Sequence, residues 1–133
     1  MDIDQFKSVN DSFGHSAGDQ VLENISELIS SLMRQGDIAC RYGGEEFLIT
    51  SPGLGMEKAR ERAEKIRALV EDMVTEFEEN KIQVTISVGI ASFPEHGIDV
   101  DDLLNKADQA LYQAKRMGRN MVMVYSQEFE AKN

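Results

Sequence analysis

Cysteine, proline and tryptophan are nearly absent, since the 133 residues include one cysteine, two prolines and no tryptophan. A single cysteine cannot form an internal disulfide, which suits a reducing compartment. Long apolar runs are also missing: none approaches the roughly 18 residues needed to span a bilayer, and the N-terminus lacks the basic-then-apolar order of a secretory signal. We therefore expect a cytoplasmic domain that makes no direct contact with a membrane.

Positive charge is scarce as well. Fourteen Lys and Arg residues face 24 Asp and Glu residues, which gives a formal net charge of −10. This sign argues against a protein that follows a nucleic-acid polymer or coats an anionic membrane. A small anionic ligand stays possible, because a metal ion or a few local cations can override the net charge. With 41% hydrophobic and 29% charged residues, the chain fits one globular domain.

Apolar residues at steps of three and four predict amphipathic helices in four places. The first is short and follows residues 1–4, which look like the end of a strand; the others span residues 20–33, 59–77 and 99–116. Asp99 opens the last helix and Gly118 offers a cap at its end.

Strand patterns alternate with these helices. Apolar runs at residues 38–42 and 47–49 flank a Gly-Gly-Glu-Glu turn and predict a β-hairpin, while residues 82–90 alternate as in a strand and residues 121–125 resemble a last strand. The order of elements predicts an α/β (α+β) domain, with helices packed on a central sheet. Residues 127–133 are expected to form a polar tail.

Carboxylates stand at two points that the strand order can bring together. Asp2 and Asp4 lie on the first strand, and Glu45 and Glu46 lie at the hairpin turn. Neighbouring strands are about 4.8 Å apart, so these acids could converge on Mg²⁺, which one or two carboxylates bind together with water and substrate phosphates. Solvated acids beside a turn are the alternative, because short acidic patterns are common.

Glycines and polar side chains add candidates with two interpretations each. Gly43 and Gly44 suit a tight turn, but absent side chains also let a phosphate approach the backbone. Asn10 and Asp19 could read the edge of a guanine, although Asp19 is also predicted to be a helix N-cap. His15 lacks the partners of a nucleophilic triad, which favours a hydrogen-bonding role in a loop. Four cations are candidates for phosphate contacts: Lys7, Arg41, Lys115 and Arg119.

Taken together, these segments resemble the GGDEF family of diguanylate cyclases. The match runs in order along nearly the whole chain, and its turn carries the Glu-containing form of the signature, which active members also use. The resemblance is carried by Asp2-Ile3-Asp4-Gln5-Phe6-Lys7, Asn10-Asp11, Phe13-Gly14-His15, Gly18-Asp19, Arg41-Tyr42-Gly43-Gly44-Glu45-Glu46-Phe47, Ser87-Val88-Gly89, Ala107-Asp108-Gln109-Ala110-Leu111-Tyr112-Gln113-Ala114-Lys115 and Gly118-Arg119-Asn120.

The resemblance implies a nucleotidyl-cyclase-like fold, with a mostly antiparallel sheet and a ferredoxin-like βαββαβ core. It also implies a nucleotidyltransferase that condenses two GTP molecules into cyclic di-GMP and releases two pyrophosphates. A homodimer would hold one GTP in each subunit, because the two 3′-hydroxyls must each face the other nucleotide's α-phosphorus. The alternative is a catalytically silent GGDEF module that senses cyclic di-GMP or GTP.

Site residues follow from the resemblance by position. Asp2, the backbone carbonyl of Ile3, Glu45 and Glu46 would hold Mg²⁺ or Mn²⁺. Both glutamates are catalytic candidates, and Glu45 could help to deprotonate the attacking 3′-hydroxyl. The substrate-binding residues implied are Asn10 and Asp19 for guanine, with Phe6, Lys7, Arg41, Gly43, Gly44, Lys115 and Arg119 for the rest of the nucleotide.

A second, inhibitory site is implied at Arg34 and Asp37, which match the family's Arg-x-x-Asp motif for binding product; a helix end followed by a turn is the alternative. Lys65 replaces the arginine expected on the following helix and lacks its planar, bidentate fork. Family domains ordinarily also start with an additional helix that this sequence does not show, and we expect an N-terminal sensor domain to be absent from this chain as well. We therefore expect residues 1–126 to be a GGDEF domain without its first helix, from a parent protein that can be membrane-anchored through an N-terminal region.

Overall fold

The computed structural model describes residues 1–131. Its strands are β1 (Asp2–Ile3), β2 (Ile38–Arg41), β3 (Phe47–Thr50), β4 (Thr75–Phe77), β5 (Asn80–Ile82), β6 (Ile86–Ile90) and β7 (Val122–Val124). Its helices are α1 (Phe6–Phe13), α2 (His15–Ser31), α3 (Met56–Asp72), α4 (Val100–Arg116) and α5 (Glu128–Ala131). Within the described residues no helix is both long and apolar enough to cross a bilayer.

The short strand β1 is the centre of the sheet. It pairs antiparallel with β6, and β6 pairs parallel with β7. On the other side of β1, the amide of Phe47 donates to the carbonyl of Met1 and the amide of Ile3 donates to the carbonyl of Glu45, which joins the β2–β3 hairpin to β1. The order is therefore β2-β3-β1-β6-β7, and the predicted, mostly antiparallel sheet with helices packed on it is confirmed.

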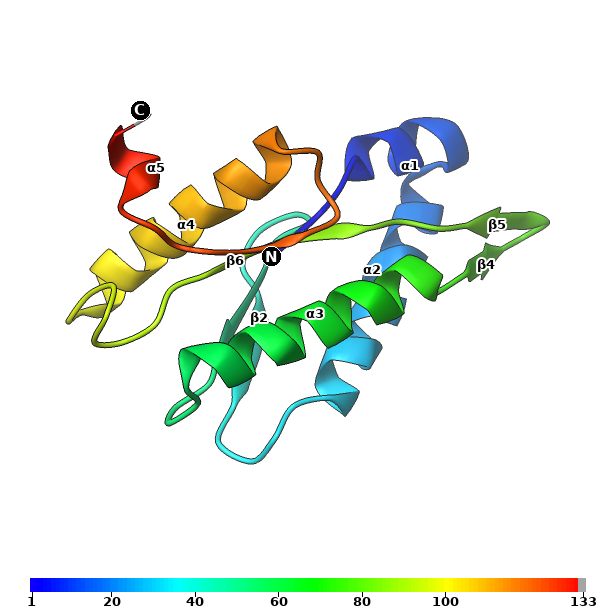
Figure 1. The fold of residues 1–133 in the computed structure, drawn as a ribbon. Coiled ribbons are helices and arrows are strands. Elements are labelled where there is room, and N and C mark those ends of the chain that lie inside the picture. Colours follow the sequence, from blue (N-terminus) through cyan, green and yellow to red (C-terminus); the bar gives the residue numbers. More distant parts are fainter. Residues whose placement is uncertain (132–133) are drawn as a thin grey trace.

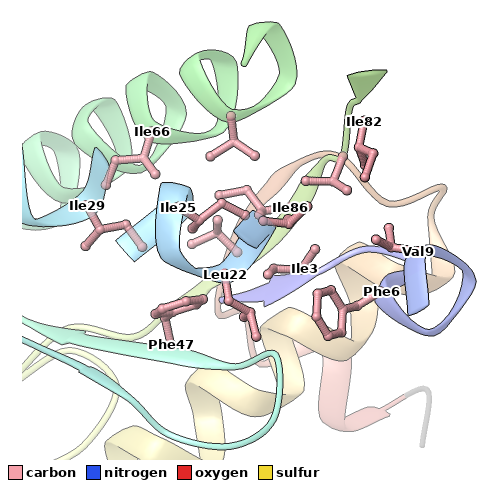
Figure 2. Packing of buried hydrophobic residues seen from close by; sticks show 14 of the residues in the cluster. Ile3, Phe6, Val9, Leu22, Ile25, Ile29, Phe47, Ile66, Ile82 and Ile86 are labelled. Carbon is pink, nitrogen blue, oxygen red and sulfur yellow. The ribbon is translucent and has the colours of Figure 1, made fainter. Parts of the chain in front are cut away.

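Helices cover both faces of this sheet, with α4 on one side and α2 and α3 on the other (Figure 1). On the α2 and α3 side, Ile25, Ile66 and Ile86 are almost completely buried and point toward one another (Figure 2). Ile3 joins the same cluster from β1. Because side chains alternate along a strand, Asp2 and Asp4 point to the opposite side, toward the end of α4.

A glycine sets how closely α4 approaches the sheet. A β-carbon on Gly89 would overlap the carbonyl oxygen of Ala107 and lie 2.5 Å from the amide nitrogen of Leu111. Both of these atoms belong to the backbone of α4, which cannot swing away as the end of a flexible side chain can. The glycine of the Ser-Val-Gly segment is therefore required by packing.

The long helix predicted over residues 59–77 is wrong at its C-terminal end. Helix α3 stops at Asp72, and Thr75–Phe77 forms β4, which pairs with β5. The chain reverses through Glu78, which adopts a left-handed φ of 55°. Apolar residues at 73 and 77 fit the spacing of a helix as well as that of a strand. Burial of Thr75, whose hydroxyl accepts a hydrogen bond from Asn24, favours the strand.

Two other boundaries differ from the prediction. Helix α2 begins at His15, directly after Gly14 with its φ of 93°, so Asp19 lies inside the helix and the predicted N-cap role is wrong. The strand predicted over residues 82–90 divides into β5 and β6. In the predicted tail, the structure has the short helix α5, and the last two residues lie outside the described part of the chain.

Candidate functional site

A cavity of about 290 Å³ lies where the hairpin turn meets α1 and α2. It gathers seven predicted site residues from three segments of the chain. The lining residues are Phe6, Lys7, Asn10, His15, Asp19, Leu22, Arg41, Gly44 and Glu45. Sequence reasoning did not place His15 and Leu22 in the site. A sequence pattern could have indicated them: residues 15, 19 and 22 are spaced by four and then three, which places all three on one face of α2 because the helix begins at His15.

Asn10, which lines this cavity, carries an unpaired acceptor. Its Oδ1 atom is buried and has no hydrogen-bond partner among the described residues. A β-carbon on Gly18 would overlap that oxygen and would lie 3.0 Å from the ring of Phe6, so only glycine at 18 leaves room for the amide. A buried polar group without a partner is costly, and a ligand that donates a hydrogen bond to it would remove that cost.

The hairpin turn is held by its own backbone and by Arg41. The amide of Tyr42 donates to the carbonyl of Glu46, and the Arg41 guanidinium donates to the carbonyl of Gly44 at 2.8 Å and 3.1 Å. Neither Gly43 nor Gly44 has a positive φ, and a β-carbon on Gly44 would meet no atom within 4 Å. The fold itself therefore does not require glycine at 44.

The predicted metal ligands lie around the junction of β1 with the turn. Asp2 is 4% exposed and forms an ion pair with Lys115 from the end of α4. The backbone of Asp2 pairs with that of Glu46 in an isolated antiparallel β-bridge. Glu45 is half-buried and lines the 290 Å³ cavity, whereas Glu46 lines a different one and lies within 3.3 Å of the position of a β-carbon on Gly43. The two glutamates of the turn thus face different surroundings.

These donors fit a hard divalent cation. Carboxylate and carbonyl oxygens are what Mg²⁺ and Mn²⁺ accept, and Mg²⁺ commonly takes one or two carboxylates and completes its shell with water and phosphates. Among residues 1–131 no group of three His, Cys, Asp or Glu side chains is arranged around a common point. A cation here would draw on Asp2, Glu45 and the carbonyl of Ile3, together with oxygens of the substrate.

The remaining predicted cations lie at two places. Lys7 is exposed at the edge of the 290 Å³ cavity. Lys115, in the last turn of α4, forms an ion pair with Asp2, and Arg119 follows in an exposed turn with a left-handed φ of 64°. The structure brings Lys115 to the metal-ligand candidates through Asp2, but neither Lys115 nor Arg119 lines that cavity.

The Arg34 and Asp37 pair forms a cluster away from this site. The Asp37 carboxylate accepts from Arg34 Nε at 3.1 Å and from Arg62 at 2.7 Å, and its side chain is fully covered. Burial alone would raise the pKa of Asp37, but hydrogen bonds from Arg34 and Arg62 outweigh burial and lower it. Lys65, the residue singled out from the sequence, is exposed on α3. Arg62, one turn earlier on α3, reaches Asp37 and was missed.

A second hollow, of about 680 Å³, lies on the α4 side of the hairpin between β3, α3 and α4. Apolar residues such as Met1, Ile49 and Leu104 line most of it, and Phe93 at its edge is 63% exposed. The expectation that residues 1–126 lack the first helix of the family stays a prediction.

Comparison with known proteins gives consistent matches. A family profile described as "Diguanylate cyclase, GGDEF domain" matches residues 1–121. Diguanylate cyclase A of Treponema denticola is 43% identical over 122 residues, which cover 92% of this chain and 33% of that protein. The chain thus spans about a third of this curated relative.

Solved structures agree with the sequence matches. The active GGEEF domain of a diguanylate cyclase from Vibrio cholerae superposes with a TM-score of 0.87 at 39% identity, covering 95% of this chain and 80% of that one. The GGDEF domain of DgcB from Caulobacter crescentus, solved in complex with c-di-GMP, has a TM-score of 0.86 at 33% identity and covers 92% of this chain and 73% of that one.

Proposed function

The chain belongs to the GGDEF domain family of diguanylate cyclases, and from this premise we propose that it condenses two GTP molecules into cyclic di-GMP with release of two pyrophosphates. The observation that carries the proposal is the 290 Å³ cavity, which joins an unpaired amide oxygen, two carboxylates and two cations at a glycine-containing turn. A purine with donors on one edge and a chain of phosphates on the other side matches that set of groups.

Base recognition falls to Asn10 and Asp19. The N1 and N2 groups of guanine donate hydrogen bonds, and the unpaired Oδ1 of Asn10 and the exposed carboxylate of Asp19 both accept. Adenine lacks this pair of donors on its corresponding edge. The site should therefore prefer GTP to ATP, because a buried acceptor left unpaired by the wrong base costs binding energy.

The phosphates would lie against the turn, near Gly43 and Gly44, with Phe6 forming part of the wall. Open space over Gly44 leaves room for a phosphate to approach the backbone. Lys7 and Arg41 would supply charge from the cavity side, and Lys115 and Arg119 would do so from the end of α4.

Asp2, Glu45 and the carbonyl of Ile3 would hold Mg²⁺ or Mn²⁺, with Glu46 as a further carboxylate. When bound, the cation would neutralise phosphate charge and favour deprotonation of the 3′-hydroxyl. Glu45, which lines the cavity, would accept that proton. Lys115 forms an ion pair with Asp2 and would contact a phosphate when Asp2 holds the cation.

Catalysis would take place in a homodimer. Each 3′-hydroxyl must attack the α-phosphorus of the other GTP, and a two-fold axis presents both attacks at once. A monomer should bind GTP and turn it over poorly.

The test is incubation of the protein with GTP and Mg²⁺, followed by chromatography for cyclic di-GMP. Glu45→Gln is the matched control, since it keeps the shape of the side chain; it should lower turnover by about a hundredfold or more while leaving the unfolding curve unchanged. If a folded sample forced to dimerise yields no product, the proposal is wrong. Unchanged turnover in Glu45→Gln would remove Glu45 from its role.

A second candidate is a sensor of cyclic di-GMP, favoured by the arginine cluster around Asp37. Two guanidinium groups at one place suit the phosphates or the guanine of the product. In an active enzyme the same cluster would serve product inhibition. Calorimetry decides between them: product binding that is lost in Arg34→Ala, in a parent protein without cyclase activity, would favour the sensor.

A further inference from the structure

Asp4 is a buried carboxylate beside the candidate site, and the proposed chemistry gives it no role. It is 7% exposed and lies two residues after Asp2. Its Oδ1 accepts from the hydroxyl of Ser87 at 2.7 Å, and its Oδ2 accepts from the hydroxyl of Thr85 at 2.7 Å and from the backbone amide of Asn120 at 3.0 Å. The last of these bonds links β1 to the turn that follows α4.

That turn has an unusual backbone. Gly118, Arg119 and Asn120 have φ values of 123°, 64° and 50°, three left-handed residues in succession, of which only the first is glycine. Non-glycine residues in this region are strained and persist where surrounding contacts hold them. The conformation of Arg119 therefore depends on what anchors its neighbours.

Asn120 is anchored from two directions. Its backbone amide donates to Asp4, while its side chain accepts from Arg67 at 2.8 Å and donates to Glu71, both on α3. The amide of Arg119 donates to the carbonyl of Ala114 at 3.0 Å, which ties the turn to α4. In Figure 1 the orange turn after α4 passes beside the blue segment that leads from β1 to α1.

Two links thus join the β1 region to the α4 region: the Asp2–Lys115 ion pair, and the hydrogen bond from Asn120, in the turn after α4, to Asp4, which follows β1. We infer that Asp4 is a positioning residue which, through the backbone of Asn120, holds Arg119 in the direction needed to contact the phosphates of the bound nucleotide. The inference rests on the proposed function, since it needs a triphosphate at the site. Asp4 itself touches neither the base nor the phosphates.

The test separates phosphate binding from base binding. Calorimetry measures the affinity for a non-hydrolysable GTP analogue and for GMP, in wild type, Asp4→Asn, Arg119→Ala and the double variant. Asp4→Asn keeps the size of the side chain and places an amide group where carboxylate oxygens now accept. We expect its affinity for the analogue to fall about tenfold, the size of one charge-assisted hydrogen bond, and its affinity for GMP to stay unchanged.

The double variant shows whether Asp4 acts through Arg119. In the Arg119→Ala background, Asp4→Asn should cause no further loss. If Asp4→Asn weakened binding by disturbing the nearby cation ligands instead, the loss of affinity would persist in the Arg119→Ala background. Additive losses in the double variant would therefore overturn the inference. Equal losses for the analogue and GMP would also overturn it, because they indicate a general structural role.

The control variant changes another hydrogen-bond partner of Asp4. Ser87→Ala removes a hydrogen bond to the other oxygen of Asp4 and should leave the affinity for the analogue within twofold of wild type. If Asp4→Asn does not fold, Asp4→Glu keeps the negative charge but moves the carboxylate away from the backbone amide of Asn120; it should weaken binding of the analogue only. Unchanged binding in that variant would contradict the inference, and wild type that binds neither ligand would overturn the proposed function with it.

Discussion

The hairpin turn and strand β6 each carry a glycine in a recognisable segment, but a side chain would meet opposite surroundings at the two places. On Gly89 it would enter the backbone of α4, whereas on Gly44 it would meet no atom within 4 Å. Packing therefore explains Gly89 completely. Gly44 has no such explanation from the protein alone, so its small size matters only when something else approaches the turn.

The same contrast separates the acidic residues. Asp4 is buried and accepts three hydrogen bonds, while the side chain of Glu45 has no hydrogen-bond or ion-pair partner among the described residues. A carboxylate held by the protein serves the fold or positions a neighbour, and a half-buried carboxylate left without a partner is available to a ligand. The carboxylate in the inner part of the sheet is thus hydrogen-bonded within the protein, whereas the one at the hairpin turn has no partner among residues 1–131.

Gly89→Ala is the strongest way to test the contrast. Because the new methyl group would overlap backbone atoms, α4 must move away from β6, and we expect about 3 kcal/mol of destabilisation. Urea unfolding followed by circular dichroism measures it, with Gly44→Ala as the control that should stay within about 0.5 kcal/mol of wild type. Equal unfolding midpoints for the two variants would contradict the claim that packing requires glycine at 89 but not at 44.

Gly44→Val tests the other half of the contrast. The side chain projects into open space, so the fold should be nearly unaffected, but it would occupy the region that a phosphate needs. We expect affinity for a non-hydrolysable GTP analogue to fall by about 10- to 100-fold, equivalent to about 1.4 to 2.7 kcal/mol. Calorimetry would contradict this if the variant binds the analogue as wild type does.

Much of the fold was predictable because the apolar periodicity is strong. The hairpin, α4 with its N-cap Asp99 and the strand β6 all follow from local patterns. The end of α3 did not, because apolar residues at 73 and 77 satisfy both a helix and a strand, and only the buried position of Thr75 against α2 decides. Local periodicity cannot contain a tertiary contact of that kind.

The site divides in a similar way. Motif positions led to Asn10, Asp19 and Glu45, which the structure gathers around one cavity. The partner of Asp37 did not follow from motif spacing: Lys65 was expected from position, but Arg62 makes the contact. Arg62 and Lys65 lie one turn apart on α3, and the rotation of α3 against the sheet decides which of them reaches the loop at Asp37. That rotation cannot be predicted from the sequence of the helix alone.

Arg62 and Lys65 therefore offer a smaller, sharper test. If the cluster at Asp37 binds cyclic di-GMP, Arg62→Ala should weaken binding about tenfold, because it removes one charged, bidentate donor. Lys65→Ala, on the same helix and exposed, should change the affinity by less than twofold. Calorimetry with cyclic di-GMP measures both. A larger loss of affinity in Lys65→Ala than in Arg62→Ala would indicate that Lys65 contacts the ligand. Arg62 would then only link α3 to the loop through Asp37.

The smallest expected effect concerns how the Asp37 cluster serves the fold itself. Hydrogen bonds from Arg34 and Arg62 lower the pKa of Asp37 below its ordinary value of 3.8. A carboxyl group with a lowered pKa in the folded state stabilises the fold at pH values above 3.8, and this contribution is lost as the pH falls through the folded-state pKa. Asp37→Asn should therefore be less stable than wild type at pH 7, and the difference in urea midpoint should shrink below pH 3.8. All other carboxylates titrate in both proteins, so the change in the difference isolates Asp37. A difference that stays constant with pH would mean that the cluster contributes no charge-dependent stability.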